Sequence, residues 1–195
     1  MLSGWRWRPG KSIKLGTQFV GNSQVIKEIR EHIEYHISNR ILLEEAGEFR
    51  PLNILLYGSP GNGKTTLIKT IANDIGNSVL HLATFSQKSD LGGNNLNNIL
   101  NPQSTKDTIA IVACEDFDRY FSEEGFNIQQ LLNGLDGANT DGSVIRIITV
   151  NDMSELEKYP ALMERFSYVS KVDYPTVDAL KQKVPTAEGS ALCLL

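Results

Sequence analysis

Residues 53–72 read NILLYGSPGNGKTTLIKTIA and contain the most specific motif of the chain. Its centre fits the pattern G-x-x-x-x-G-K-[ST], with Gly58, Ser59, Pro60, Gly61, Asn62, Gly63, Lys64 and Thr65 in order. An apolar run of strand length precedes the pattern, and a run with the composition of a helix follows it. Glycines let backbone N–H groups converge on phosphate oxygens, and the helix N-terminus adds a partial positive charge. The stretch therefore predicts a phosphate-binding P-loop, the Walker A motif.

Two side chains of this loop can carry specific chemistry. The Lys64 ammonium can reach the terminal phosphates of a nucleotide, and the Thr65 hydroxyl can hold Mg²⁺. Thr66 comes next, in the first turn of the predicted helix. We therefore expect residues 58–66 to bind the phosphates of a nucleotide.

Five apolar runs along the chain have the length of strands, and most are continuously apolar instead of alternating. They cover residues 53–57, 78–83, 108–114, 144–150 and 168–172. Helical patterns cover residues 22–37, 64–74, 94–100 and 128–135. Buried strands that alternate with helices are typical of a parallel sheet covered on both faces. The sequence thus predicts a three-layer α/β fold, a P-loop NTPase with a five-stranded parallel sheet.

The composition narrows the class of protein. The 195 residues are 41% hydrophobic, which suits one domain with a core, and the net charge of −4 disfavours a general nucleic-acid binder. Two distant cysteines, no recognisable signal peptide and no apolar run of ~20 residues favour a reducing soluble compartment such as the cytoplasm. We expect an arm over residues 1–20, the P-loop domain over residues 21–175 and a short irregular tail over residues 176–195.

Adjacent carboxylates follow the third apolar run, where Glu115 and Asp116 come directly after Cys114. In a parallel sheet the carboxyl ends of the strands face the ligand crevice, so both acids are expected beside the P-loop. One carboxylate would support Mg²⁺, and the other would polarise the water that attacks the γ-phosphate. The pair predicts a Walker B site for nucleotide hydrolysis and leaves open which acid has which role.

Two further polar residues fit a hydrolysis site. Asn151 comes directly after the apolar run at 144–150, so its amide can hydrogen-bond both the attacking water and the γ-phosphate. Arg165 precedes the last run and could project into the site of a neighbouring subunit as an arginine finger.

The order of these motifs resembles the core of an AAA ATPase over residues 18–175. The stretches that carry the resemblance are GSPGNGKT, IVACEDFD, QQLLNGLDG, IITVND and PALMERF. More closely, the chain resembles the branch that contains the mitochondrial chaperone that translocates the Rieske iron–sulfur protein during cytochrome bc complex assembly. This closer resemblance rests on residues 79–101, on CEDFDRYF with its acids in Glu-Asp order, and on IQQLLNGLDG.

The resemblance implies an ATP hydrolase that uses ATP and Mg²⁺. It implies that Glu115 stands on the metal side, that Asp116 activates water and that Asn151 is the sensor-1 residue. Val20 and Gly21 match the segment that lines the adenine. The resemblance also implies a homo-oligomeric ring, a hexamer or heptamer, whose finger acts in trans and whose chaperone-like work is to remodel or assemble a protein client.

Three departures from the family pattern set further expectations. The finger region reads MERF where the family usually reads R-P-G-R, so Arg165 is the single candidate finger. Residues 88–93 hold no aromatic residue of the kind with which unfoldases grip a threaded chain. Only 20 residues follow Pro175, so we expect the C-terminal helical lid of the family to be absent.

Two alternatives to a hydrolytic remodelling enzyme stay open at this point. The chain could be an ATP-dependent binding or assembly module with little turnover, because Asp116 is shorter than the usual Glu and no lid is expected. It could also be a loader ATPase linked to nucleic acid, although the acidic balance and the lack of a basic–aromatic stripe weigh against this.

Overall fold

The computed structural model describes residues 5–7, 21–47, 50–76, 78–83, 94–102, 108–121, 123, 126–137 and 144–176. Four sequence predictions fall wholly or partly outside the described residues: the arm, apart from residues 5–7, the adenine contact of Val20, the region without aromatics at residues 88–93, and the tail from residue 177 onward. The remaining predicted elements can be compared with the structure directly.

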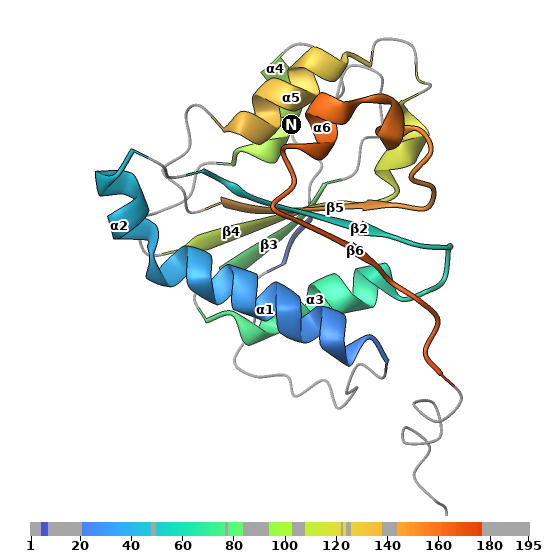
Figure 1. Ribbon diagram of the computed structural model, residues 1–195, viewed down its shortest axis with the longest axis horizontal. Helices are drawn as coiled ribbons and strands as arrows, with labels where there is room; N and C mark the ends of the chain where they lie inside the picture. Colours follow the sequence, from blue (N-terminus) through green and yellow to red (C-terminus); the bar gives the residue numbers. More distant parts are fainter. Residues whose placement is uncertain are drawn as a thin grey trace, which may run out of the picture.

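A six-stranded sheet forms the centre of the molecule (Figure 1). Its strands are β1 (Trp5–Trp7), β2 (Leu52–Tyr57), β3 (Ser78–Ala83), β4 (Ile109–Cys114), β5 (Val144–Val150) and β6 (Tyr168–Lys171), in the spatial order β1-β3-β4-β5-β2-β6. The pairs from β3 to β6 are all parallel. The predicted five-stranded parallel sheet is therefore confirmed, and each strand lies within one residue of its predicted bounds at either end.

The sixth strand, β1, was not predicted. Residues 5–7 lie in the segment expected to be an irregular arm, but they pair antiparallel with β3, with the Cα of Trp5 opposite that of Leu82. Aromatic residues favour strands, and the outer edge of β3 offers backbone groups to pair. The pairing joins positions far apart in the chain, so no local sequence pattern predicts it.

Helices cover both faces of the sheet (Figure 1). One face carries α1 (Ser23–Ser38), which α2 (Arg40–Glu45) extends, and α3 (Lys64–Asp74). The other face carries α4 (Asn94–Leu100), α5 (Ile128–Asp136) and α6 (Pro160–Met163). Two 3₁₀ helices, η2 (Phe117–Tyr120) and η3 (Leu156–Lys158), follow β4 and β5. None of the described helices combines the length and the apolar character that a membrane span requires.

The sheet separates two apolar layers because alternate residues of a strand point to opposite faces. In β2, Leu55 packs into the layer under α4 and α5, while Ile54 and Leu56 pack into the layer under α1 and α3. All three are fully buried, and each such side chain contributes about 1.5–3 kcal/mol of burial free energy. The continuous apolar runs in the sequence reflect this burial on both faces.

Asn22 stands directly before α1 and holds the helix by an unusual contact. It adopts a left-handed conformation with φ 51° and makes no side-chain capping bond to α1. Its Nδ2 instead donates to the Asp173 carbonyl oxygen at 2.8 Å, and its Oδ1 accepts from the Asp173 N–H at 3.1 Å. This reciprocal pair fixes the beginning of α1 to the segment that follows β6.

Candidate active site

The P-loop leaves the carboxyl end of β2 and leads directly into α3, as predicted. Gly58, Gly61 and Gly63 have positive φ angles of 148°, 86° and 87°. Gly58 also has no room for a side chain, since a Cβ there would lie 2.3 Å from the Val172 carbonyl oxygen. The spacing of the glycines is thus required by the backbone path that brings Lys64 to the helix N-terminus.

Residues 172–175, which follow β6, pack against the P-loop and are hydrogen-bonded to it. The Val172 carbonyl oxygen accepts a hydrogen bond from Asn62 Nδ2 at 2.7 Å, and the Tyr174 hydroxyl donates to the Pro60 carbonyl oxygen at 2.9 Å. Gly21 lies against the same segment, where its Cβ would be 2.9 Å from Pro175 Cβ. We call residues 172–175 the strap. The strap thus contacts both Gly21 and the phosphate loop.

Lys64 is 6% exposed and lies at the centre of the site. Its Nζ donates to the carbonyl oxygens of Gly58 at 2.5 Å and Ser59 at 3.2 Å, and to Asn151 Oδ1 at 2.9 Å. Burial lowers the pKa of the Lys64 ammonium, and the nearby charges of Asp116, Asp118 and Glu115 oppose that shift. The cation is therefore held beside the carboxylates at a site where phosphate would be a favourable neighbour.

Asp116 connects the Walker B turn to Asn151. Its Oδ1 accepts from Asn151 Nδ2 at 3.0 Å, and its Oδ2 forms an ion pair with Arg119 at 2.9 Å. The Asp116 backbone is in the left-handed region, with φ 50° and ψ 43°, and its N–H donates to Thr149 Oγ1 at 3.0 Å. A non-glycine residue in this region costs roughly 1–3 kcal/mol, and such strain concentrates at functional sites.

Two other carboxylates near Lys64 have oxygens available for a ligand. Glu115 Oε1 and Asp118 Oδ1 are buried and have no hydrogen-bond partner among the described residues. Asp118 Oδ2 accepts from the N–H groups of Asn151 at 3.1 Å and Asp152 at 3.3 Å. Unpaired carboxylate oxygens beside a P-loop fit a hard cation such as Mg²⁺. Sequence reasoning missed Asp118, although the EDFD pattern contains it.

The other residues predicted to bind the nucleotide lie on the P-loop and in the first turn of α3. Thr65 is half-buried in the first turn of α3, next to Lys64, and Thr66 is exposed beside it. Ser59, Pro60 and Gly61 are exposed on the loop, whereas Asn62 is buried and used to hold the strap. Sequence reasoning also missed Tyr174 and Asn22, because their partners are far along the chain.

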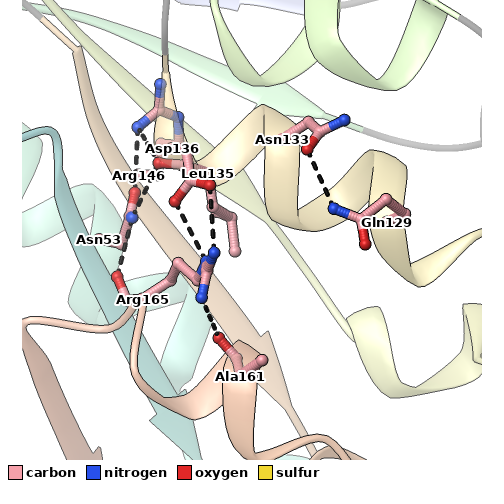
Figure 2. A network of polar contacts seen from close by, with 8 residues as sticks. All are labelled: Asn53, Gln129, Asn133, Leu135, Asp136, Arg146, Ala161 and Arg165. Atoms are coloured by element: carbon pink, nitrogen blue, oxygen red, sulfur yellow. Dashed lines mark hydrogen bonds and ion pairs between the residues drawn. The ribbon is translucent and has the colours of Figure 1, made fainter.

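Arg165 does not join this cluster. Its carbonyl oxygen accepts from Asn53 Nδ2 at 2.9 Å, near the beginning of β2, whereas the P-loop follows the end of that strand. Its guanidinium pairs with Asp136, with Nε 3.1 Å from Oδ1 and Nη2 3.2 Å from Oδ2 (Figure 2). The five residues from Asn53 to Gly58 span about 16 Å at ~3.3 Å per residue. The structure thus unites Lys64, the acids and Asn151, and holds Arg165 at the opposite edge of the sheet.

Comparison with known proteins agrees with this architecture. Residues 54–174 match the model of the "ATPase family associated with various cellular activities (AAA)". A 26S proteasome regulatory subunit 4 homolog of Schizosaccharomyces pombe is 31% identical over 189 residues, which cover 89% of this chain and 42% of that protein. Proteasome-activating nucleotidase 2 of Haloferax volcanii is 28% identical over 171 residues, covering 81% of this chain and 42% of that protein.

Solved structures share the fold at low sequence identity. A chain in the Escherichia coli HORMA:CdnC:Trip13 complex superposes with a TM-score of 0.71 at 13% identity, covering 96% of this chain and 76% of that one. Caenorhabditis elegans PCH-2 gives a TM-score of 0.59 at 20% identity, covering 82% and 46%. The chain spans less than half the length of the two curated relatives named above. The matched family model, the P-loop and the sheet order agree: the chain belongs to the AAA family of P-loop ATPases.

Proposed function

We propose that this chain binds Mg-ATP and hydrolyses it, and that the hydrolysis drives the remodelling or assembly of a protein client. The observation that carries the proposal is the hydrogen-bonded series Lys64–Asn151–Asp116, which connects the P-loop cation to a carboxylate. Binding of phosphate alone does not require a carboxylate such as Asp116 hydrogen-bonded to the side-chain amide of Asn151. A hydrolysis site needs that acid near the attacking water.

The residues divide the work as follows. Lys64 and the N–H groups of the P-loop hold the β- and γ-phosphates, and Thr65 and Glu115 are the residues that would hold Mg²⁺. When bound, Mg²⁺ neutralises the charge that develops on the transferred phosphoryl group. Asn151 orients the attacking water, and Asp116 accepts its proton at a carboxylate oxygen. Asp118 keeps the backbone of Asn151 in place through its bond to that N–H.

We further propose that Arg165 completes the site of a neighbouring subunit in a homo-oligomeric ring, a hexamer or heptamer. Arg165 lies at the opposite edge of the sheet from its own P-loop, a span of about 16 Å along β2 that one side chain does not bridge. A finger held there can serve only another copy of the chain. The HORMA:CdnC:Trip13 complex contains a structural neighbour together with other proteins, which supports a protein client.

The relation to the branch of the Rieske-protein translocase is a separate proposal. It rests on the Glu115-Asp116 order and on the IQQLLNGLDG stretch. A phylogenetic tree of AAA domains tests it, and grouping of this chain with the proteasomal subunits would contradict it. A cytoplasmic location, expected from the cysteine usage, is likewise a proposal that fractionation of cells can test.

One observation favours a second candidate function, a nucleotide-dependent binding module with little turnover. Both Asp116 oxygens have partners, Asn151 on one side and Arg119 on the other. A carboxylate with both oxygens engaged is less accessible to an attacking water, so ATP could act mainly as a switch. A single-turnover rate no faster than uncatalysed hydrolysis would favour this reading.

The experiment that tests the leading proposal measures mass and ATPase rate together over a range of protein concentrations. We expect the rate per subunit to rise with assembly, to require Mg²⁺, and to be lost in the Lys64→Ala variant. A rate per subunit that is independent of concentration would overturn the trans role of Arg165. Stimulation by DNA or RNA would instead favour the loader ATPase.

A further inference from the structure

Arg146 is a fully buried arginine near the beginning of β5, at 0% exposure. Its neighbours on the same face of the strand are Val144 and Ile148, which pack into the apolar layer under α4 and α5. Among the described residues, no carboxylate forms an ion pair with it. Burial lowers the pKa of Arg146 to about 10, so its guanidinium stays protonated at neutral pH.

Oxygen acceptors surround this charge in place of a carboxylate. Nε donates to the Leu100 carbonyl oxygen at 2.9 Å, and Nη1 donates to Asn53 Oδ1 at 3.0 Å and to the Leu135 carbonyl oxygen at 3.4 Å. Nη2 donates to Asn101 Oδ1. Leu100 and Leu135 lie in the last turns of α4 and α5, where carbonyl groups carry the negative end of the helix dipole. One guanidinium thus caps two helices.

Burying a charged side chain costs free energy unless the charge is fully hydrogen-bonded. A whole buried polar group, replaced together with its partners by well-packed hydrophobic residues, is often neutral or stabilising, by about 1–4 kcal/mol. A buried, ionised arginine bonded to the ends of two helices therefore indicates that the relative position of α4, α5 and β5 matters for function.

Asn53 extends the contacts of Arg146 to the proposed finger. Its Nδ2 donates to the carbonyl oxygens of Leu135 at 3.2 Å and Arg165 at 2.9 Å (Figure 2). Its own carbonyl oxygen accepts from the Ser167 N–H at 2.8 Å. The backbone of Arg165 and Ser167, just before β6, is therefore hydrogen-bonded to Asn53 at the beginning of β2.

The side chain of Arg165 is tied to the same place. It pairs with Asp136, the residue next to Leu135, and it donates to the Ala161 carbonyl oxygen at 2.9 Å. Leu135 accepts from both Arg146 and Asn53. The backbone of Arg165 and the helix end that carries its carboxylate partner are thus anchored to one buried group of residues. We call Arg146, Asn53 and Asn101 the Arg146 cluster.

We propose that the Arg146 cluster positions Arg165 for its action on the neighbouring subunit, with Arg146 and Asn53 as the positioning residues. This inference rests on the proposed trans role of Arg165. A finger stabilises the transition state only when its guanidinium arrives at the correct place, and a misplacement of about 1 Å can cost on the order of 10²-fold in rate. The side chain of Arg165 is itself 28% exposed. The buried Arg146 cluster fixes the position of the backbone that carries it.

The test mixes two defective variants of the full chain. Asp116→Asn subunits have a dead site and an intact finger, whereas Asn53→Ala subunits keep an intact site and lose the anchor of the finger. We expect each variant alone to be at least ~10-fold slower than the wild type in kcat, with KM for ATP unchanged for Asn53→Ala. In an equal mixture about one quarter of the interfaces combine a good site with a good finger, so the rate should recover to about a quarter of the wild-type value.

Two parallel mixtures make the result specific. Arg165→Ala mixed with Asp116→Asn tests the trans finger itself, and Arg146→Lys mixed with Asp116→Asn keeps the buried charge while it removes the guanidinium fork. Ile29→Val, in the opposite apolar layer, serves as a control of mild destabilisation whose kcat should match the wild type. If Asn53→Ala does not fold, as judged by circular dichroism and assembly mass, Arg146→Lys carries the test.

The outcomes separate the two proposals. Recovery with Arg165→Ala but not with Asn53→Ala or Arg146→Lys would overturn the positioning role and leave the trans finger in place. Failure to recover in every mixture would overturn the trans finger and this inference with it. Recovery in all the mixtures, with KM unchanged, is the expected result.

Discussion

The two ends of the parallel strands differ in how their polar groups are bonded. We call the side where the strands end the carboxyl edge of the sheet and the side where they begin the amino edge; β2 and β5 contribute to both. At the carboxyl edge, β2 and β5 lead to the P-loop and Asn151, and buried oxygens of Glu115 and Asp118 have no partner among the described residues. At the amino edge, the same strands carry Asn53 and Arg146, and every nitrogen of the Arg146 guanidinium donates a hydrogen bond. One edge leaves oxygens available, and the other satisfies its donors.

This difference indicates what each edge is for. A buried polar atom without a partner costs about 1–3 kcal/mol, so it persists where a ligand supplies the missing contact. A fully bonded polar network makes its surroundings rigid and specifies one arrangement. The carboxyl edge therefore suits binding and chemistry, and the amino edge suits positioning. Mutations at the two edges should accordingly act on different quantities.

The largest effect is expected from the carboxylates of the carboxyl edge. Asp116→Asn should lower kcat by about 10²–10⁴-fold while nucleotide affinity is kept, because a general base contributes that much. Glu115→Gln should instead raise the Mg²⁺ concentration needed for half-maximal rate. Steady-state ATPase assays with titrated Mg²⁺ separate the two roles.

An exchange of these phenotypes would reverse the assignment of the two acids. Wild-type stability of both variants, measured by urea unfolding, is the control, because neither change should disturb the sheet. A large loss of stability in either variant would contradict the distinction between the two edges.

The second prediction concerns the free energy of unfolding. Arg146→Met leaves the acceptors of Leu100, Leu135, Asn53 and Asn101 without their donor, and should lower the free energy of unfolding by about 3 kcal/mol or more, because each buried acceptor left unpaired costs about 1–3 kcal/mol. Asn151→Ala at the other edge should cost no more than about 1.5 kcal/mol. Urea denaturation of the two variants measures both values. Equal losses would show that the edges do not differ as described.

The carboxyl edge was the part of the site that local sequence patterns could predict. The P-loop, the Walker B acids and Asn151 each follow a largely apolar strand, and a parallel sheet brings the ends of such strands together. The amino edge could not be predicted in this way. Arg146 interrupts an apolar run, and its partners Asn101 and Asn53 are 45 and 93 positions away in the chain.

The same limit explains the other residues that sequence reasoning missed. Tyr174 contacts the P-loop across 114 positions, and Asn22 contacts the strap across 151. Strand β1 depends on pairing with β3, which local composition does not specify. Asp118 is a different case, because it stands in the motif itself, and only its unpaired oxygen separates it from a surface acid.

The third prediction tests the contact between the strap and the P-loop. Gly58→Ala would place a Cβ 2.3 Å from the Val172 carbonyl oxygen, at a φ of 148° that alanine rarely adopts. Because both groups are backbone-anchored, the strap or the loop must shift, at a cost of about 1–3 kcal/mol. Thermal unfolding and nucleotide affinity should both decline. Gly76→Ala, where a Cβ meets nothing within 4 Å, is the matched control.

The smallest effect concerns the pH dependence of nucleotide binding at Lys64. Burial lowers the pKa of this ammonium from its ordinary value of 10.5 in the free protein, and bound phosphates would favour its charged form. Binding therefore takes up protons, so affinity should fall once the pH exceeds the lowered pKa, by at most about tenfold per pH unit. Fluorescence titration with a nucleotide analogue between neutral pH and pH 10 measures this. Lys64→Arg keeps its charge over that range, so its affinity, although weaker, should not show the decline. A wild-type affinity that stays level up to pH 10 would mean that the site does not desolvate Lys64, and that the carboxyl edge is more open to water than its burial indicates.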